Sequence, residues 1–416
     1  MINISKLYCD EVTPGDWIRY GKKGSGERAG DIVPKEASER RPIVVWNITR
    51  ACNLKCVHCY NDSGSRRAKD ELSTQEAEEV LRDLAEFGVP SVLFSGGEPL
   101  MRKDLFELLE SARELGLRTV ISTNGTLITA DVAGKIKDRG VSYVGVSLDG
   151  IGQINDKFRG VAGAFDKAVR GIKNCQDAGI RVGLRLTLTR RNVQDLGRLF
   201  DFFEAEGIER ACFYHLVPSG RGRVIAKEGL GHAQSREAIE TILARTKWLK
   251  EAGRKTDILT VDNHVDGVYL YLKLLKEDPA RAAEVWKLLA WNGGGLYSSG
   301  VGIGCIDFHG KVHPDQFWWH YDLGDVHKRP FSRIWMDTSD PLLRGLKNRR
   351  KYIKGRCRLC KFFEVCGGSL RVRADLHFGD PWAPEPACYL SDEEIGLDGD
   401  KRAELVRCGE VFQIPD

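Results

Sequence analysis

The residues best suited to chemistry are gathered in one short loop, residues 51–60 (ACNLKCVHCY). Cys52, Cys56 and Cys59 fall within this loop, and the next cysteine along the chain is Cys175. Three thiolates can bind three irons of a cubane 4Fe–4S cluster and leave the fourth iron without a protein ligand. A metal with an open coordination position suits catalysis, whereas a structural site is closed. The spacing leaves one alternative open, a zinc site that takes its fourth ligand from elsewhere in the chain.

A second group of cysteines stands near the end of the sequence. It supplies four thiolates, which is enough for a closed tetrahedral site. Zinc and an iron–sulfur cluster both fit this spacing. The members of the group are Cys357, Cys360, Cys366 and Cys388. Of the remaining cysteines, Cys175 and Cys212 fall in a predicted helix and a predicted strand and are expected in the core.

Short apolar runs alternate with amphipathic segments between residues 43 and 217. Six runs rich in β-branched and aromatic residues, from PIVVWNIT to ACFYHL, are separated by helical patterns. A capping box, Ser73 to Glu76, begins the first helix, and Gly88 ends it. Runs that are apolar on both faces indicate a parallel sheet covered by helices. Six units are too few for the closed eight-unit barrel, so the sequence predicts an α/β fold built on a partial, open (β/α)6 barrel.

Four parts of the chain differ in pattern. Residues 1–42 form an irregular N-terminal segment, 43–217 the β/α core, and 218–300 a mainly helical connector. Residues 301–416 begin with a hairpin that turns near His309 and Gly310. The rest of this part has little periodicity, as expected where a metal centre supplies the order.

Glycines and polar residues follow several of the predicted strands. Ligands bind at the carboxyl ends of parallel strands in open α/β folds, and glycine lets the backbone approach a partner closely. These positions are therefore the candidate ligand contacts of the core. They are Gly96, Gly97 and Glu98 after the second strand, Ser122 and Asn124 at the third, Ser147 and Asp149 at the fourth, and Arg185 in the fifth.

The three-cysteine loop and these strand ends together resemble the radical S-adenosylmethionine (SAM) enzymes. The resemblance implies that SAM chelates the open iron and is cleaved reductively to a 5′-deoxyadenosyl radical. It also implies that the Gly96–Gly97–Glu98 segment binds the methionyl ammonium, and that Ser122 and Asn124 contact the ribose and carboxylate. Ser147, Asp149 and Arg185 complete the cofactor site. His58 fills a usually aromatic position and is expected to pack near the adenine.

The C-terminal cysteines resemble the SPASM extension, which carries auxiliary iron–sulfur clusters in this family. The match is partial. Asp315 stands where a cysteine is usual, and residues 367–370 (Gly-Gly-Ser-Leu) lack another. The resemblance therefore implies an outer auxiliary cluster without the inner one, and two 4Fe–4S clusters in total.

Longer stretches, among them FYHLVPSGRG, VDNHVDG and WAPEPACYLSDEEIG, resemble the tetrapyrrole-modifying branch of the family. This branch includes enzymes of the sirohaem-dependent haem pathway. The implied reaction removes two acetate side chains from 12,18-didecarboxysirohaem and gives iron-coproporphyrin III. Three alternatives stay open: a haem d1 enzyme acting on propionates of the same macrocycle, a SPASM maturase of peptides, and a non-enzymatic ferredoxin-like or zinc scaffold protein.

A substrate with many carboxylates and a flat macrocycle requires cationic donors and apolar walls. The candidate substrate contacts are His215, Arg221, Arg371 and Arg373. Aromatic side chains at 317–319 (Phe-Trp-Trp) are candidate walls, with core packing as the alternative. Cys305 is a candidate catalytic residue, as a hydrogen-atom donor, although a packed structural cysteine is the simpler interpretation.

The composition restricts which partners and which cellular location are expected. A formal net charge of +4 with scattered basic residues argues against a nucleic-acid partner. No apolar run reaches the length of a membrane span, and the N-terminus lacks the apolar region of a signal peptide. Twelve cysteines without a secretion signal indicate metal or redox chemistry in a reducing compartment, so a cytoplasmic location is expected. The predicted chemistry also requires a low-potential electron donor of the flavodoxin or ferredoxin type.

Overall fold

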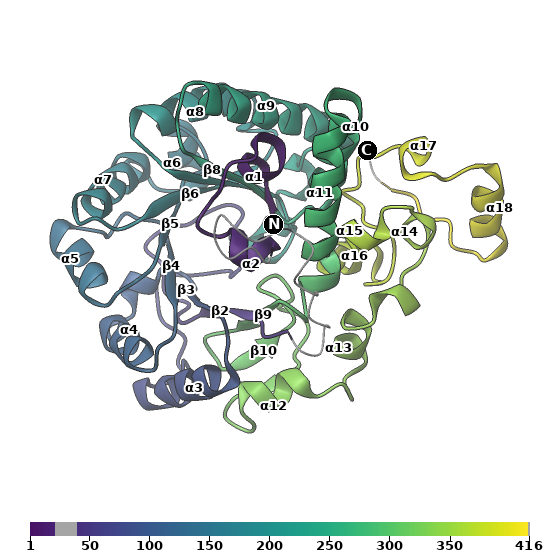
Figure 1. The fold of residues 1–416 in the computed structure, drawn as a ribbon. Helices are drawn as coiled ribbons and strands as arrows, with labels where there is room; N and C mark the ends of the chain where they lie inside the picture. Colours follow the sequence, from purple (N-terminus) through teal and green to yellow (C-terminus); the bar gives the residue numbers. More distant parts are fainter. Residues whose placement is uncertain (21–39, 415–416) are drawn as a thin grey trace.

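The computed structural model describes residues 1–20 and 40–414. Its centre is an eleven-stranded sheet that curves into a partial barrel with helices outside (Figure 1). Seven strands that follow one another along the chain are neighbours in this sheet and run parallel. They are β2 (Ile43–Asn47), β3 (Val92–Ser95), β4 (Thr119–Thr123), β5 (Val144–Ser147), β6 (Val182–Leu188), β7 (Arg210–His215) and β8 (Asp257–Val261). The six predicted strands and the partial α/β barrel are thus confirmed, and β8 is a further strand that lies within the predicted connector.

Four strands complete the sheet at its two edges. β1 (Ile2–Asn3) pairs antiparallel with β8. At the other edge β9 (Ile303–Ile306) runs parallel to β2, and β10 (Lys311–His313) and β11 (Gly324–Asp325) continue in antiparallel order. The pairing of β9 with β10 confirms the predicted hairpin, and Gly310 has the positive φ of 78° that its turn requires. The C-terminal part of the chain is therefore joined to the barrel through its sheet.

Helices of the barrel cover the outer face of the parallel strands. In α3 the apolar residues recur at helical spacing, so that Ala77, Val80, Leu81 and Leu84 are buried against the sheet. The predicted capping box at Ser73 and the left-handed Gly88 are both present. The barrel helices are α3 (Thr74–Phe87), α4 (Leu105–Glu114), α5 (Ala130–Asp138), α6 (Gln153–Arg159), α7 (Ala164–Asp177), α8 (Leu196–Ala205) and α9 (His232–Glu251).

The N-terminal residues close one end of the barrel. α1 (Ile4–Cys9) and α2 (Asp16–Tyr20) lie in front of the strands in Figure 1. Ser5 Oγ donates to the Thr256 carbonyl just before β8, so these helices cover the amino-terminal ends of the strands. The carboxyl-terminal ends therefore face the opposite side of the molecule.

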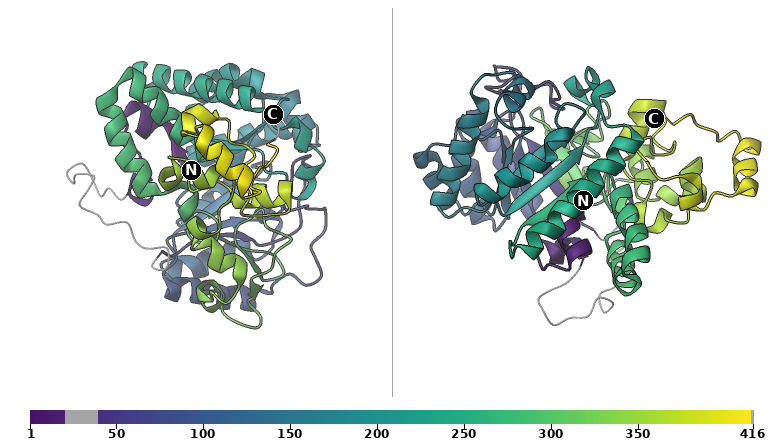
Figure 2. Two further views of the ribbon diagram at one scale, coloured as in Figure 1. Left: turned by 90° about the vertical axis from the view of Figure 1, so that its right-hand side faces the viewer. Right: turned by 90° about the horizontal axis from the view of Figure 1, so that it is seen from above.

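Two antiparallel helices connect the barrel to the C-terminal extension. α10 (Val265–Glu277) and α11 (Pro279–Asn292) pack on each other and on α15 (Phe363–Cys366) of the extension. The extension lies beside the barrel rather than on its end (Figure 2). Its helices are short: α12 (Phe331–Met336), α13 (Pro341–Leu346), α14 (Arg356–Leu359), α15 (Phe363–Cys366), α16 (Arg371–Phe378), α17 (Asp392–Ile395) and α18 (Gly399–Arg407). The 3-10 turns are η1 (Pro99–Met101), η2 (Val193–Asp195), η3 (Gly220–Arg223), η4 (Ala226–Glu228), η5 (Gly294–Tyr297) and η6 (Arg349–Lys351).

Within the described residues, no helix combines the length and the apolar character that crossing a membrane requires.

Candidate active site

The loop with Cys52, Cys56 and Cys59 follows β2 at the carboxyl-terminal edge of the barrel. Hydrogen bonds from three sides fix its backbone. Cys52 N donates to the Gly64 carbonyl at 2.7 Å. Lys55 N and Val57 N donate to the carbonyls of the last residues of α6, each at 3.0 Å. The loop is therefore shaped by neighbouring segments and not by contacts among its own cysteines.

Arg221 in η3 supports the loop from the third side. Its Nε donates to the Cys56 carbonyl at 3.0 Å, and its terminal nitrogen donates to Asp62 Oδ1 at 2.9 Å and to the Ser63 carbonyl at 2.7 Å. The sequence analysis assigned Arg221 to a substrate carboxylate. The structure instead places its guanidinium on the cysteine loop, because η3 lies directly against it.

The two glycines after β3 approach the chain itself. Gly97 N donates to the Thr49 carbonyl, and Glu98 N to the Ala51 carbonyl, both at 2.7 Å. A side chain at Gly97 would collide with the Ala51 carbonyl oxygen, and one at Gly96 would press on Thr49. These glycines therefore permit the close packing of this segment on the start of the cysteine loop.

Glu98 links two of the predicted strand-end motifs. The side chain is fully buried and accepts hydrogen bonds from Thr123 Oγ1 at 2.7 Å and from Asn124 N at 2.8 Å. Burial raises the pKa of Glu98 to about 7, although these hydrogen bonds oppose the shift. Its carboxyl group therefore joins the end of β3 to the end of β4 and does not face an open site.

Asn124 continues this connection to the cysteines. Its Nδ2 donates to Asn53 Oδ1 at 2.8 Å and lies 4.0 Å from Cys52 Sγ. On neighbouring strands Arg185 donates to Ser122 Oγ at 2.7 Å, and Ser147 stands opposite Arg185 in the β5–β6 register. The Nε atom of Arg185 is buried without a hydrogen-bond partner. The predicted residues of β4, β5 and β6 thus meet at one edge, with an unpaired donor among them.

Asp149, Arg159 and His58 form a charged cluster beside Cys56. Asp149 is fully buried and forms an ion pair with the terminal NH2 group of Arg159; its Oδ2 also lies 3.3 Å from His58 Nε2. Arg159 donates to Cys56 Sγ at 3.7 Å. Burial lowers the pKa of His58 to about 4, so its ring is neutral at pH 7. The sequence analysis missed Arg159, because the end of α6 contains no motif that links it to a cysteine 103 positions earlier.

His58 packs edge-on against Phe158, with 5.0 Å between ring centroids. Its Nδ1 atom, and the Nε atom of Arg159, are buried without hydrogen-bond partners in the described structure. Unpaired buried polar atoms of this kind are costly unless a ligand satisfies them. Together with three thiols on a polar loop, they fit a bound iron–sulfur cluster and an adjacent polar cofactor.

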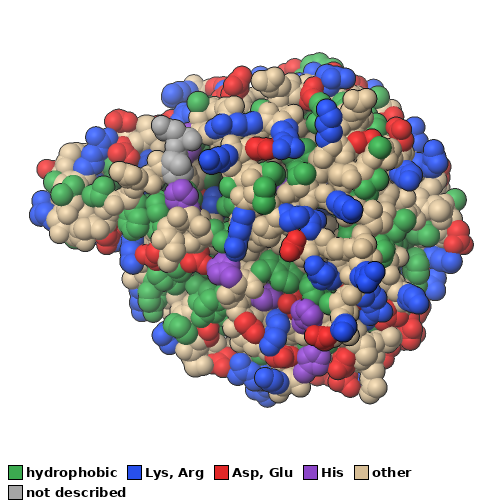
Figure 3. Space-filling view, turned by 180° about the vertical axis from the view of Figure 1, so that it is seen from behind, with side chains coloured by type: hydrophobic (Ala, Val, Ile, Leu, Met, Phe, Trp, Pro, Cys, Tyr) green, Lys and Arg blue, Asp and Glu red, His purple; other side chains and the backbone are tan. Residues whose placement is uncertain are grey.

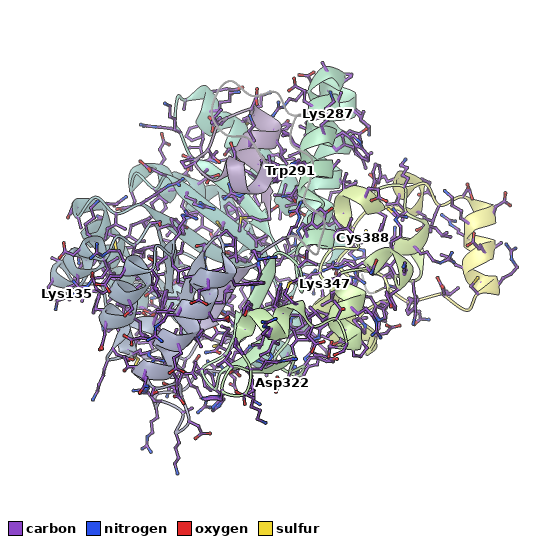
Figure 4. The ribbon with its side chains drawn as sticks, turned by 60° about the horizontal axis from the view of Figure 1, so that its bottom comes forward. Lys135, Lys287, Trp291, Asp322, Lys347 and Cys388 are labelled. Carbon is purple, nitrogen blue, oxygen red and sulfur yellow. The ribbon has the colours of Figure 1, made fainter. Side chains whose placement is uncertain are left out.

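The second cysteine group surrounds a small cavity in the C-terminal extension. Cys357, Cys360, Cys366 and Cys388 all line it, and its other walls include Val265, Val268, Phe362, Phe363 and Leu390. Glu385 N donates to Cys357 Sγ, and Phe362 N to Cys360 Sγ, both at 3.4 Å. In Figure 4, Cys388 lies in the extension, on the opposite side of the molecule from Lys135 of α5.

The thiols of this cavity surround a space and do not meet at a point. Among the described residues, no group of three or more His, Cys, Asp or Glu side chains is arranged to hold a single metal ion. A zinc ion requires four sulfurs at about 2.3 Å from one centre. Four thiols around this cavity can hold a zinc ion or an iron–sulfur cluster, and backbone N–H groups commonly donate to the sulfurs of either kind of site.

A larger cavity of about 540 Å³ opens at the carboxyl-terminal ends of β6 and β7. Leu188 and His215, the last residues of these strands, line it together with Arg373 of α16. Two of the four predicted substrate residues thus share one cavity. Arg190 and Lys227, which the sequence analysis did not single out, add positive charge to its lining. Lys, Arg and His side chains surround apolar ones in the middle of the face opposite α1 and α2 (Figure 3).

Arg371 does not belong to this cavity. Its side chain is fully buried, and it donates to the carbonyls of Gly368, Pro381 and Ala383. The terminal nitrogens of Arg371 already donate to backbone carbonyls, and its Nε, like that of Arg373, is buried without a partner. That Arg371 binds a substrate carboxylate stays a prediction. Arg371 also orders the chain around the four-cysteine cavity.

Cys305 in β9 is fully buried, and Asn47 Nδ2 donates to its sulfur at 3.4 Å. Asn47 in turn accepts from the Tyr60 hydroxyl at 3.2 Å, just after the cysteine loop. Burial raises the pKa of the Cys305 thiol well above its ordinary value, so it remains protonated at neutral pH. A protonated thiol is the form that a hydrogen-atom donor requires, and this role stays a prediction.

The aromatic residues after β10 pack in the interior. Trp318 is fully buried in a hydrophobic cluster with Val217, Leu346 and Val372, and its Nε1 donates to Asp375. Phe317 belongs to the same cluster and packs edge-on against Tyr60. Core packing, the alternative interpretation, describes these two residues.

A partial α/β barrel with a three-thiol loop after its first parallel strand defines a class of enzyme, and comparison with known proteins agrees with it. Residues 46–203 match the model of the Radical SAM superfamily. The chain belongs to this superfamily. Membership implies a 4Fe–4S cluster and SAM at the three-cysteine loop.

The relatives narrow the class. The chain is 55% identical to Fe-coproporphyrin III synthase of Methanosarcina barkeri over 399 residues, which are 95% of this chain and 99% of that protein. It is 43% identical to Pre-heme d1 synthase of Dinoroseobacter shibae, over 86% of this chain and 88% of that one. The solved structure of Streptococcus suis SuiB bound to S-adenosylmethionine has the same fold, with a TM-score of 0.66, 19% identity, and coverage of 84% of this chain and 78% of that one.

Proposed function

We propose that this protein is an Fe-coproporphyrin III synthase, an enzyme that removes two acetate side chains from 12,18-didecarboxysirohaem. The observation that carries the proposal is identity of 55% along nearly the full length of a protein with that name. Pre-heme d1 synthase is less similar, at 43%. The acetate reaction is therefore preferred over the haem d1 alternative, which acts on propionates.

The large cavity at the ends of β6 and β7 suits the proposed substrate. Its 540 Å³ lie in the range of about 300–1,000 Å³ typical of small-molecule sites. Leu188, Leu216 and Leu230 provide apolar surface for a flat macrocycle. Arg190 and Lys227 provide positive charge for its carboxylates. The combination of apolar walls and cations is what a polycarboxylated tetrapyrrole requires.

Arg373 is held in place within this cavity. One terminal nitrogen donates to Glu385 Oε1 at 2.9 Å, and the other donates to the Asp262 carbonyl at 2.8 Å. Its Nε is buried without a partner in the described structure. The orientation of Arg373 in the cavity wall is thus fixed, which supports the proposal that it contacts the substrate.

The cavity and the cysteine loop are neighbours in the fold. Pro218 lines the cavity, and Ser219, the next residue, donates to the Phe317 carbonyl at 2.7 Å. Gly220 then lies so close to the loop that a side chain would collide with the carbonyls of Cys59 and Tyr60. A macrocycle in the cavity would therefore lie next to the segment that carries the cluster ligands.

Cys52, Cys56 and Cys59 would hold the catalytic cluster, and the edge formed by β4, β5 and β6 would bind SAM. Bound there, SAM would be the source of a 5′-deoxyadenosyl radical, and the chain would orient the substrate and exclude water around it. Arg185 and His58 have buried unpaired nitrogens for polar contacts to SAM.

Cys305 is the proposed hydrogen-atom donor, and a flavodoxin or ferredoxin is the proposed source of electrons. The twelve cysteines form no disulfide, which fits the reducing cytoplasm.

An auxiliary 4Fe–4S cluster is proposed for the four-cysteine cavity, and no third cluster. Asp315 and residues 367–370 stand where further cysteine ligands were expected. Asp315 caps its own loop by accepting from Phe317 N at 2.8 Å. The buried guanidinium of Arg349 donates to the carbonyls of Ser299, Gly367 and Ser369. A side chain thus fills the space between these segments, which supports two clusters in total.

The decisive experiment is anaerobic incubation of the reconstituted enzyme with SAM, dithionite and 12,18-didecarboxysirohaem, followed by mass analysis. We expect loss of two acetate groups, an early product that lacks one, and two SAM molecules consumed per macrocycle. A product that lacks propionates would replace the proposal with the haem d1 reaction. A macrocycle left intact by an enzyme that cleaves SAM would exclude both.

A further inference from the structure

His215 combines burial with an unused nitrogen in the large cavity. It is the last residue of β7, and only 6% of its surface is exposed. Its Nε2 lies 2.9 Å from Asp266 Oδ2. Its Nδ1 has no hydrogen-bond partner among the described residues, and the residue lines the cavity. The residue is therefore fixed on one side and open on the other.

The carboxylate determines which nitrogen is available. A carboxylate only accepts hydrogen bonds, so when Asp266 is a carboxylate the Nε2–H group of His215 is the donor in this contact. The lone pair of a neutral ring is then on Nδ1. The Tyr389 hydroxyl donates to the other carboxylate oxygen at 2.8 Å, which fixes Asp266 in turn. A histidine whose second nitrogen is bound by a carboxylate is the usual arrangement of a metal ligand.

Other histidines differ from His215 in their partners or in their position. His58 also lies beside a carboxylate, Asp149, and has an unpaired Nδ1, but it does not line this cavity. Both ring nitrogens of His313 have partners, the Tyr321 carbonyl at 2.7 Å and Asp307 at 3.4 Å. His264 contacts the N-terminal amine, and neither residue lines the cavity. His232 does line it, but its Nε2 lies 3.0 Å from the Pro386 carbonyl. Among the described residues, His215 alone joins a carboxylate partner to a free nitrogen in this cavity.

We infer that His215 is the axial ligand of the substrate's iron and binds it through Nδ1. The inference rests on the proposed function, because it requires an iron tetrapyrrole in the cavity. Axial ligation would fix the height and centre of the macrocycle above β7. The cations at 190, 227 and 373 would then fix its rotation through the carboxylates.

The test measures iron ligation separately from binding of the macrocycle. Ferric iron-coproporphyrin III and metal-free coproporphyrin III are each titrated anaerobically into the full-length protein. Absorption and electron paramagnetic resonance spectra report the axial ligand of the iron form, and fluorescence quenching reports binding of the metal-free form. The main variant is His215→Gln, whose amide still donates to Asp266 and so preserves the fold. His232→Ala and His377→Ala are matched controls, since both residues line the same cavity.

Wild-type protein should give the spectrum of an imidazole-ligated iron, and both controls should retain it. His215→Gln should lose this spectrum and bind the iron form more weakly, by about tenfold or more, with unchanged affinity for the metal-free form. Imidazole added to His215→Gly should restore the spectrum. Identical iron spectra for wild type and His215→Gln would overturn the inference and leave the proposed function intact. Failure of the wild type to bind either porphyrin would instead reject the cavity as the substrate site, and with it both proposals.

Discussion

The two cysteine groups of this protein are held by opposite means. The three-cysteine loop is bound through polar contacts: backbone hydrogen bonds from Gly64 and α6, the guanidinium of Arg221, and the amide of Asn124. The four-cysteine cavity is lined mainly by apolar side chains, from α10, α15, α17 and the segments at Phe362 and Leu390, together with Arg356 and Glu385. One group lies at an edge with unpaired polar atoms, and the other surrounds a cavity with mainly apolar walls.

Under the proposed function, this difference would match a difference in task between a catalytic and an auxiliary cluster. A cluster that must bind and release SAM needs polar groups and an accessible iron. A cluster in an apolar enclosure is shielded from solvent and exchange. Burial raises the pKa of Cys388 to about 12, so without iron its thiol remains protonated at neutral pH. A cluster that binds there would displace protons from buried thiols.

The largest effect is expected from replacing the cysteines of one group, because activity and iron content then distinguish the two groups. Replacement of Cys52 by Ala should abolish 5′-deoxyadenosine formation under reducing conditions, because two thiolates do not hold a site-differentiated cluster. Replacement of Cys52, Cys56 and Cys59 together should still leave about four irons bound per chain. Iron and acid-labile sulfide assays measure the second result. Zinc in place of iron in that triple variant would contradict the assignment of the four-cysteine cavity.

Glu98, which supports the three-cysteine loop, should make the free energy of unfolding depend on pH. Burial raises the pKa of this carboxyl from 4.5 to about 7. Between these pH values the folded protein binds more protons than the unfolded chain, so the free energy of unfolding falls as pH rises. Glu98→Gln should remove about 3 kcal/mol of this pH dependence. Denaturant unfolding at pH 5 and pH 8 measures it.

Glu79→Gln is the matched control for Glu98, because Glu79 is exposed on α3. It should leave the pH dependence as it is in the wild type. The prediction for Glu98→Gln fails if the difference in unfolding free energy between variant and wild type is the same at both pH values.

Replacing Arg221 should have a smaller effect, on how firmly the three-cysteine loop holds its iron. Its replacement by Ala removes three hydrogen bonds from the cysteine loop, at a cost of about 1.5–3 kcal/mol. The iron of the three-cysteine loop should be lost faster to a chelator, while iron of the four-cysteine cavity is lost at the wild-type rate. Arg223→Ala, on the same turn but exposed, should behave as wild type. Equal acceleration of both iron losses would show a general loss of stability instead.

The smallest expected effect concerns Arg159, whose charge lies beside Cys56. A positive charge near a cluster favours the reduced state, so Arg159→Met should lower the reduction potential of the catalytic cluster by tens of millivolts, on the order of what hydrogen bonds to cluster sulfurs contribute. Lys157→Met, exposed on the same helix, is the control. Potentiometric titration followed by electron paramagnetic resonance measures both. A shift of the auxiliary cluster alone would contradict the contact.

Local patterns predicted much of this structure. The six strands, the capping box at Ser73 and the hairpin at Gly310 all follow from short sequence signals, and each is confirmed. β8 was not predicted, because its five residues (DILTV) stand between two long helical stretches without a β/α repeat around them. A short apolar run of this kind is equally compatible with an irregular segment.

The arginines show how far the residues of the site can be predicted from the sequence. Their side chains serve whatever acceptors the fold brings near, and sequence does not reveal these. Arg371 and Arg221 donate to backbone carbonyls, whereas Arg373 lines the cavity. Arg159 and Asp266 act on partners far away in sequence, Cys56 and His215. Only the folded chain shows which charged residue faces a ligand and which one holds the scaffold.

The position of β2 has a consequence for the order in which the chain assembles. β2 pairs with β3 on one edge and with β9 on the other. The first pairing can form early in synthesis, but β9 lies near the other end of the chain and emerges much later. Until then β2 is an uncovered edge strand, and such edges attract other chains. The loop that carries the catalytic cysteines begins where this strand ends, so its final support must wait until most of the protein has been made.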